Sequence, residues 1–256
     1  MDANNQKWNA SLYVDKHAFV YEYGEDLIRL LDVKEGEEIL DIGCGTGQLT
    51  AVIKQQGAFV TGLDASQDMI EKACDLYPDI AFKVANVADF TLQTPVDAIF
   101  SNATLHWVLD YQEAAKCMYN ALKPNGRLVV EFGGKGNVDM VISTLKKVLK
   151  DYGYFTNAKI QPWFFPSISA YTAVLENIGF TVTLAQLYDR PTLLADSKKG
   201  IEDWLQMFAT SFFEGIPEAQ VVAICKEVQN ELYPFLYKND NWYADYKRLR
   251  VIAVKL

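Results

Sequence analysis

The stretch EILDIGCGTGQLTAVI, residues 38–53, joins a short apolar run to an amphipathic run through three closely spaced glycines. The apolar run predicts a buried strand over 38–42, and the amphipathic run predicts a helix that ends near residue 56. Between them, Gly43, Gly45 and Gly47 predict a tight turn whose backbone closely approaches a ligand, because glycine has no side chain and tolerates positive φ values. Glycine-rich turns bind nucleotides of several kinds, so the surrounding sequence has to indicate which ligand this turn serves.

Strand and helix patterns alternate along the rest of the first half of the chain. Apolar runs predict strands over 58–63, 80–85, 96–101 and 126–132. Helical patterns separate them, one capped by Ser66 and one over 110–122 that stops at the turn sequence KPNG. This alternation indicates a parallel sheet with helices on both faces. Right-handed crossovers place the loops after the strands at one edge, where such sheets bind ligands, and the glycine turn lies at that edge.

The alternation changes after residue 132. Helical patterns over 139–150 and 169–178 are followed by strand patterns over 180–187 and 250–256. We therefore expect one domain over 1–256 with an α/β fold, a doubly wound, mostly parallel seven-stranded sheet. Its predicted core comprises 25–133, 168–190 and 248–256, its lid 1–24, and its helical cap insertions 134–167 and 191–247. Apolar residues at helical spacing over 201–212 are expected to form the core of the second insertion.

The composition and charge of the chain limit the classes of partner that we expect. The chain has 33 acidic and 24 basic residues, a net charge of −9, and no basic stripe, so we do not expect nucleic acid as a partner. Two histidines and four scattered cysteines without CxxC spacing predict no metal site and no disulfide. The polar N-terminus lacks a signal-peptide core and no apolar run is long enough to span a membrane. A cytoplasmic protein without membrane contact is expected, as a monomer or a homodimer.

Two carboxylates flank the glycine turn. The dinucleotide pattern GxGxxG is broken here, because Gln48 stands where a later glycine would be needed. Asp41 precedes the turn, and its negative charge would oppose a pyrophosphate but favour an ammonium group. Asp64, 23 residues later at the end of the next predicted strand, suits the hydroxyls of a ribose, although it could instead cap the following helix. Together these residues indicate an adenosine-type ligand with an ammonium group.

Five segments in this order resemble the motifs of class I S-adenosylmethionine-dependent methyltransferases: LDIGCGTGQLT, GLDAS, ANVADF, VDAIFSNATLHWV and ALKPNGRLVVEF. Within that group the chain is most similar to the trans-aconitate methyltransferase-like (methyltransferase type 11/12) proteins, in SNATLHWV and in WNASLYVDKHAFVYEYGEDLI. The resemblance implies a Rossmann-like class I fold, S-adenosylmethionine as the cofactor and S-adenosylhomocysteine as its product.

The resemblance also implies the residues of the cofactor site. The methionyl end and the sulfonium would contact Asp41, Gly43, Cys44, Gly45, Gln48, Asn102 and Ala103. The ribose and adenine would contact Asp64, Ala65, Met69, Asn86 and Val87. Asn86 stands where many relatives have Asp, and it can still accept a hydrogen bond through its amide oxygen; an ordinary loop residue is its alternative role. Aromatic faces suited to a sulfonium are offered by Tyr13, Phe19 and Trp107, or these rings serve in core packing.

Methyl transfer from a sulfonium is an in-line displacement, in which the protein aligns the reacting atoms and excludes water. His106 follows the fourth strand and is the candidate catalytic residue, with three possible roles: general base, substrate contact or structural residue. A phenol or amine acceptor would need a base, whereas a carboxylate is already a nucleophile at neutral pH. The relatives that the chain resembles methylate a carboxylate.

We therefore expect a methyltransferase that acts on a small-molecule acceptor, on oxygen, with a carboxylate as the leading candidate. An acidic acceptor would need cationic partners, for which Arg190, Arg248 and Arg250 are candidates alongside ordinary salt-bridge roles. Trp163, Tyr171 and Tyr243 could line its site. The alternatives are a non-catalytic S-adenosylmethionine-binding protein and a nicotinamide-dependent oxidoreductase, and the broken glycine pattern and Asp41 argue against the second.

Overall fold

The computed structural model describes residues 24–256, which divide into two compact units. The first unit comprises the described residues up to 135 together with 163–187 and 248–256, and the second comprises 136–162 and 188–247. The expected organisation as one domain with a lid and two insertions stays a prediction. Tyr13 and Phe19, which the sequence assigns to the cofactor site, lie outside the described residues.

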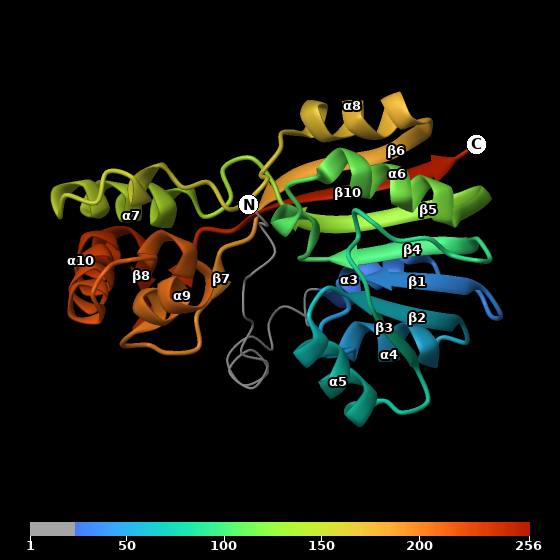
Figure 1. The fold of residues 1–256 in the computed structure, drawn as a ribbon, viewed down its shortest axis with the longest axis horizontal. Helices are drawn as coiled ribbons and strands as arrows, with labels where there is room; N and C mark the ends of the chain where they lie inside the picture. Colours follow the sequence, from blue (N-terminus) through green and yellow to red (C-terminus); the bar gives the residue numbers. More distant parts are fainter. Residues whose placement is uncertain (1–23) are drawn as a thin grey trace. The chain divides into compact units, whose positions relative to one another are not determined.

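A seven-stranded sheet organises the first unit (Figure 1). Its strands are β1 Glu38–Ile42, β2 Phe59–Asp64, β3 Ala81–Val84, β4 Val96–Asn102, β5 Leu122–Gly133, β6 Phe180–Asp189 and β10 Lys247–Lys255. They follow the order β3-β2-β1-β4-β5-β10-β6, in which β3 to β5 run parallel and β10 runs antiparallel to β5. The order reverses between β1 and β4, the switch point where open sheets bind ligands. The predicted doubly wound, mostly parallel sheet is confirmed.

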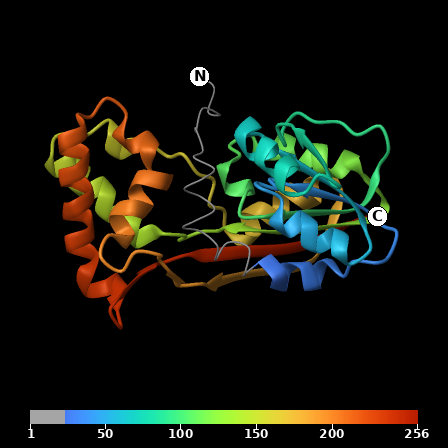
Figure 2. The ribbon, with the colours of Figure 1, turned by 90° about the horizontal axis from the view of Figure 1, so that it is seen from below.

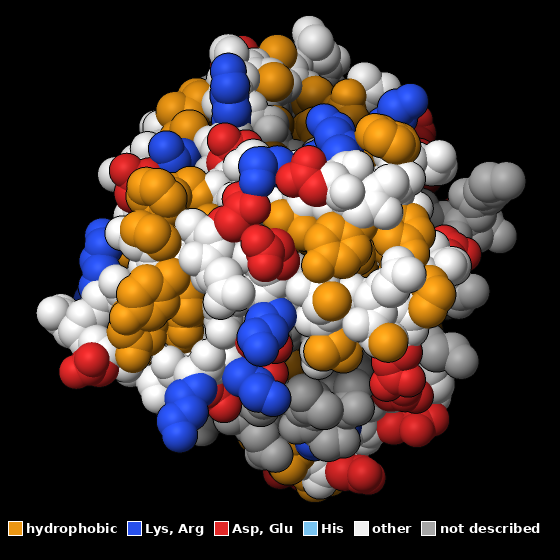
Figure 3. Space-filling view, turned by 90° about the vertical axis from the view of Figure 1, so that its left-hand side faces the viewer, with side chains coloured by type: hydrophobic (Ala, Val, Ile, Leu, Met, Phe, Trp, Pro, Cys, Tyr) orange, Lys and Arg blue, Asp and Glu red, His pale blue; other side chains and the backbone are white. Residues whose placement is uncertain are grey.

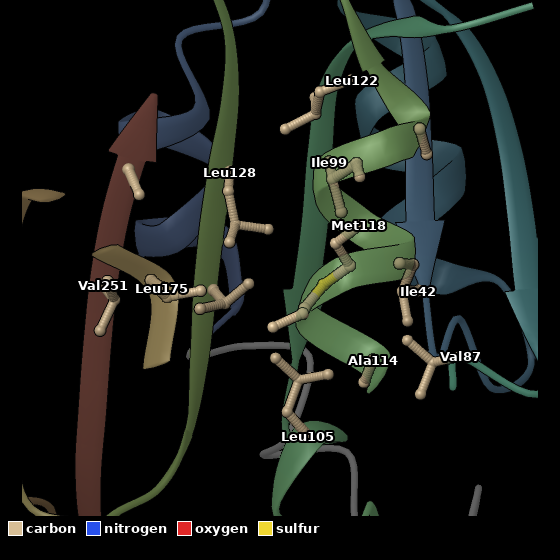
Figure 4. Close-up of a cluster of buried hydrophobic side chains, with 14 of the residues drawn as sticks. Ile42, Val87, Ile99, Leu105, Ala114, Met118, Leu122, Leu128, Leu175 and Val251 are labelled. Carbon is tan, nitrogen blue, oxygen red and sulfur yellow. The ribbon is translucent and has the colours of Figure 1, made fainter. Parts of the chain in front are cut away.

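Helices cover both faces of this sheet because its strands are apolar on both sides (Figure 2). One face packs against α3 Gly24–Leu31 and α4 Gln48–Gln55, and the other against α6 Tyr111–Ala121 and α8 Ile168–Ile178. A further helix, α5 Gln67–Leu76, contacts β2 and β3. Figure 4 shows Met118 of α6 in the same apolar cluster as Ile42 and Ile99 of the sheet. The loops after β1, β2 and β4 are thereby fixed at one edge.

The KPNG sequence differs from its prediction. It was expected to be a turn between the helix ending near residue 122 and a strand beginning at 126, but β5 already begins at Leu122. Asn125 adopts a positive φ of 63°, and the pairing of β4 with β5 shifts register between Val96 and Ala98. The turn is therefore absorbed as an irregularity within β5, because Pro124 cannot donate to the ladder and the chain must bulge around it.

The second unit is mainly helical. Its helices are α7 Asp139–Asp151, α9 Gly200–Phe208 and α10 Glu218–Leu236, and short strands β7 Thr192–Leu193, β9 Asn241–Ala244 and β8 Tyr237–Lys238 form a three-stranded sheet. The apolar residues predicted at helical spacing, Ile201 to Phe212, are all buried, so their assignment to a protein core is confirmed. On the face shown in Figure 3, side chains of both charges are interspersed with apolar patches. Over residues 24–256, no helix has the length and apolar character that crossing a membrane requires.

Candidate cofactor and acceptor site

The three glycines of the turn all adopt positive φ, 71° at Gly43, 54° at Gly45 and 86° at Gly47. A Cβ atom at Gly43 would lie 2.0 Å from Thr104 Oγ1, and one at Gly47 would lie 2.7 Å from the Phe82 ring. A Cβ atom at Gly45 would meet nothing within 4 Å. Gly43 and Gly47 are thus required by packing within the protein, whereas Gly45 borders open space that fits the close approach of a ligand.

Hydrogen bonds from neighbouring strands hold the turn. Gly43 N and Cys44 N both donate to Leu63 O, at 2.7 and 3.0 Å. From the β4 side, Ser101 Oγ donates to Ile42 O at 2.8 Å and Thr104 Oγ1 donates to Gly43 O at 3.3 Å. The amides of Gly43 and Cys44 are therefore engaged within the protein. Sequence reasoning missed both hydroxyls, although the run SNAT directly after a strand was a usable signal.

Asp41 and Asp64 place two enclosed carboxylates at the ends of neighbouring strands. Asp41 is 2% exposed and accepts from Thr50 Oγ1 at 2.6 Å. Burial raises the pKa of Asp41 to about 7; the Thr50 hydrogen bond opposes this rise, and the charge of Asp64 adds to it. Burial also raises the pKa of Asp64. A neighbouring cation and hydroxyl donors would offset the free-energy cost of keeping these buried carboxylates ionised. The pair therefore fits the ammonium and ribose of the expected cofactor.

The residues assigned to the ribose and adenine gather at the ends of β2 and β3. Asp64 Oδ2 accepts from Gly45 N and Asp64 Oδ1 accepts from Ser66 N, each at 2.9 Å. Ser66 itself caps α5 by accepting from Met69 N at 3.3 Å, as predicted. Ala85 N donates to Asp64 O, which brings the next loop beside Asp64. Ala65 N also bonds to this carboxylate, so three described backbone amides use three of its four lone pairs, and the fourth suits a ribose hydroxyl.

The other four members of this group differ in their surroundings. Met69 and Val87 are buried, and Ala65 is exposed. Asn86 is exposed, and its Oδ1 accepts from Ala88 N at 3.0 Å in a local turn. This bond uses one lone pair of the amide oxygen that was expected to contact the adenine edge. The contact of Asn86 with the adenine therefore stays a prediction, and the hydrogen bond to Ala88 N fits its alternative role as a loop residue.

The methionyl group of residues lies at the ends of β1 and β4. Cys44 is buried, and burial raises the pKa of its thiol, so it is not a nucleophile. Gln48 begins α4 and accepts from Thr46 Oγ1 at 2.7 Å. Asn102 ends β4, and Ala103 adopts a positive φ of 57° while its amide donates to Glu131 O at 2.7 Å. The structure thus brings Asp41, the glycine turn and Ala103 to the switch point.

His106 lies in the short helix η1 Leu105–Trp107 and is buried. Its Nδ1 accepts from Gly133 N at 3.3 Å, so the imidazole continues the ladder of β5 where β4 has ended. Burial, and then the charge of Arg248, lowers the pKa of His106 well below its usual range. The neutral ring therefore carries its hydrogen on Nε2, where it can donate but cannot accept a proton.

Aromatic rings surround this histidine. His106 lies 5.4 Å from Trp107 and 5.7 Å from Phe165, between ring centroids. Trp163 stacks on Phe165 at 5.7 Å and meets Trp107 edge-on at 5.6 Å. Trp163, offered by the sequence as a lining residue, is thus brought to the end of β4. Tyr171 is instead buried in the apolar core against Phe132, and Arg190 and Tyr243 belong to the second unit.

A buried ion pair continues the site across the sheet. Glu131 of β5 stands opposite Arg250 of β10, and Arg250 Nε lies 2.6 Å from Glu131 Oε2. Arg248, two residues earlier on β10, is 6% exposed and stands opposite Gly133. Sequence reasoning offered both arginines but missed Glu131, for which the signal was a carboxylate within the apolar run RLVVEF.

Comparisons with known proteins agree with the expected class of protein. Residues 40–130 match a family model described as a methyltransferase domain. The chain is 34% identical to an uncharacterized methyltransferase of Schizosaccharomyces pombe, over 97% of this chain and 98% of the relative. It is 33% identical to a trans-aconitate 2-methyltransferase of Escherichia coli, over 96% and 97%. The crystal structure of an S-adenosylmethionine-dependent methyltransferase of Mesorhizobium loti has the same fold, with a TM-score of 0.54 and 19% identity over 90% and 96%.

The chain therefore belongs to the S-adenosylmethionine-dependent methyltransferases, and it is an enzyme of that class. The predicted class of protein and the Rossmann-like fold are confirmed. The individual cofactor contacts, the role of His106 and the acceptor stay predictions.

Proposed function

We propose that this enzyme transfers the methyl group of S-adenosylmethionine to a carboxylate oxygen of a small organic acid. The observation that carries the proposal is the chemistry where β4 and β5 end and β10 begins. His106 offers an N–H donor there, Arg248 and Arg250 offer guanidinium groups, and Glu131 is bonded to Arg250. Donors and cations suit an anionic acceptor, whereas an amine or phenol would need a base. Relatives named trans-aconitate 2-methyltransferase support the same acceptor class.

The bound cofactor supplies a sulfonium methyl group, whose carbon–sulfur bond breaks as its carbon bonds to the carboxylate oxygen, leaving a methyl ester and a neutral thioether. No proton moves, so the enzyme's residues only bind, orient and exclude water. Asp41 and Asp64 would hold the ammonium and the ribose, and Asn102 and Ala103 would flank the reacting centre. Trp107, Trp163 and Phe165 would keep water from it.

The test is a methyl-transfer assay with radiolabelled S-adenosylmethionine and trans-aconitate. We expect a product that releases labelled methanol on mild alkaline hydrolysis, as a methyl ester does and an N-methyl or ether product does not. Transfer only to amines or phenols in a parallel acceptor panel would overturn the carboxylate acceptor. Calorimetry with S-adenosylhomocysteine on the wild type and on Asp64→Asn separates a wrong acceptor from a protein that does not bind the cofactor.

A further inference from the structure

A row of polar side chains crosses one face of the main sheet at its ligand edge. Farther from that edge, this face carries apolar residues that pack against α3 and α4, namely Ala98 and Phe100 on β4 and Val129 on β5. Two residues further along each strand the same face carries Asn102 and Glu131, since side chains alternate along a strand. Asn102 pairs with Glu131, and Glu131 pairs with Arg250, so the three lie side by side on β4, β5 and β10.

Arg248 lies on the same face of β10 as Arg250, two residues closer to the ligand edge of the sheet. Its partner across the ladder is Gly133, which has no side chain to obstruct the guanidinium. Gly133 N is the donor to His106 Nδ1, and the charge of Arg248 acts on His106, so the arginine and the histidine are neighbours. The charges of Glu131, Arg248 and Arg250 sum to +1. The charge of these three side chains therefore suits an anion.

Resting on the proposed function, we infer that Arg248 binds a second anionic group of the acceptor, and so selects acids with two or more carboxylates. The attacking carboxylate is a poor candidate for this contact, because a guanidinium bonded to it would stabilise the ground state and weaken the nucleophile. Distance agrees with this, since β10 lies two strands, roughly 10 Å, from the β4 end that flanks the methyl group.

The guanidinium suits this role chemically. It has five N–H donors in a planar fork that matches a carboxylate. It can therefore bind a carboxylate of the acceptor with some of these donors while the others keep their contacts within the protein. Beside it, Arg250 Nε lies 2.6 Å from Glu131 Oε2, and the Glu131 side chain is 0% exposed. Arg250 is thus engaged in supporting the row, whereas Arg248 lies nearer the edge at which acceptor and cofactor would meet.

The experiment is calorimetric titration of the S-adenosylhomocysteine-loaded enzyme with three probes: trans-aconitate, fumarate and crotonate. Crotonate keeps an unsaturated carboxylate but has no second anionic group. We expect the wild type to bind the two polycarboxylates at least tenfold more tightly than crotonate. Arg248→Gln should weaken their binding on the order of 100-fold, to the level of crotonate, and leave the cofactor affinity unchanged. Arg248→Lys should fall between, because it keeps the charge without the fork.

Arg127→Gln is the matched control. Arg127 lies at the opposite end of β5, is partly buried and pairs with Glu37 at 2.6 Å, so Arg127→Gln removes a guanidinium charge away from the site. It should bind all probes as the wild type does. Polycarboxylate affinity within threefold of the wild type in folded Arg248→Gln and Arg248→Lys would overturn the inference, as would wild-type binding of crotonate as tight as that of fumarate. Binding without methyl ester formation would instead count against the proposed function alone.

Discussion

At the residue scale, Asp41 makes the ligand-free enzyme sensitive to pH. Its folded pKa of about 7 exceeds the unfolded value of 3.8, so the folded state keeps a proton that the unfolded state releases between these values. The contribution to stability is complete below pH 4 and is lost as the pH rises to 7. We expect Asp41→Asn to be more stable than the wild type at pH 7.5 by roughly 2–4 kcal/mol, and no more stable at pH 4. Urea unfolding of the ligand-free proteins at both pH values measures this.

Asp97→Asn gives a control of opposite sign. The hydrogen bond from Lys123 lowers the pKa of Asp97, so its stabilisation is present above the unfolded pKa and is lost as the pH falls. Its substitution should therefore destabilise the protein at pH 7.5 more than at pH 3. An Asp41→Asn effect that does not change with pH would contradict the buried, protonated state of Asp41.

A second prediction at this scale concerns His106. Because its Nδ1 accepts from Gly133 N, Asn at this position can supply an amide oxygen in the same role, whereas Leu cannot. If the acceptor is a carboxylate, His106→Asn should keep the methyl-transfer rate within about tenfold, and His106→Leu should lose stability by about 1–3 kcal/mol through the unpaired amide. Rates and urea midpoints of both variants check this. A loss of more than 1,000-fold in folded His106→Asn would favour the general base instead.

At the element scale, the glycine turn separates packing from ligand binding. Gly43→Ala combines a positive φ with a collision with Thr104, so we expect a loss of roughly 2–5 kcal/mol in unfolding free energy. Gly45→Ala has only the backbone cost, about 1–2 kcal/mol, because its new methyl group meets no protein atom. That methyl group would occupy the space offered to the cofactor, so S-adenosylhomocysteine affinity should fall at least tenfold. Unfolding and calorimetry on both variants test this, and equal stability losses would contradict it.

At the scale of the whole molecule, each unit has its own buried contacts, and Gln229 marks those of the second. Its Oε1 accepts from Ile201 N and Glu202 N at the start of α9, at 3.1 and 3.3 Å, and its Nε2 donates to Lys198 O at 2.9 Å. Gln229→Leu leaves these buried groups unpaired, at a cost of about 2–4 kcal/mol. Hydrogen exchange should therefore accelerate in α9 and α10.

The central strands of the main sheet provide the internal control for Gln229→Leu, since β1 and β4 belong to the first unit. Their protection and the affinity for S-adenosylhomocysteine should stay as in the wild type. Val222→Leu on exposed α10 surface is the matched variant that should change neither unit. Loss of protection throughout the sheet in Gln229→Leu would show that the two units unfold together.

The sequence by itself determined the order of strands and helices in the main sheet, the glycine turn and the class of enzyme. The elements and the turn follow from local patterns, since apolar periodicity, glycine spacing and Ser66 as a cap act within a few residues of one another. The class of enzyme follows from the resemblance of five ordered segments to methyltransferase motifs. Only the tertiary structure decided what His106, Glu131 and Arg248 lie beside. Gly133 N reaches His106 from another strand, and the row of Asn102, Glu131 and Arg250 exists only because three strands pair in one register. Register between distant segments is set by how whole faces pack, and no local pattern records it.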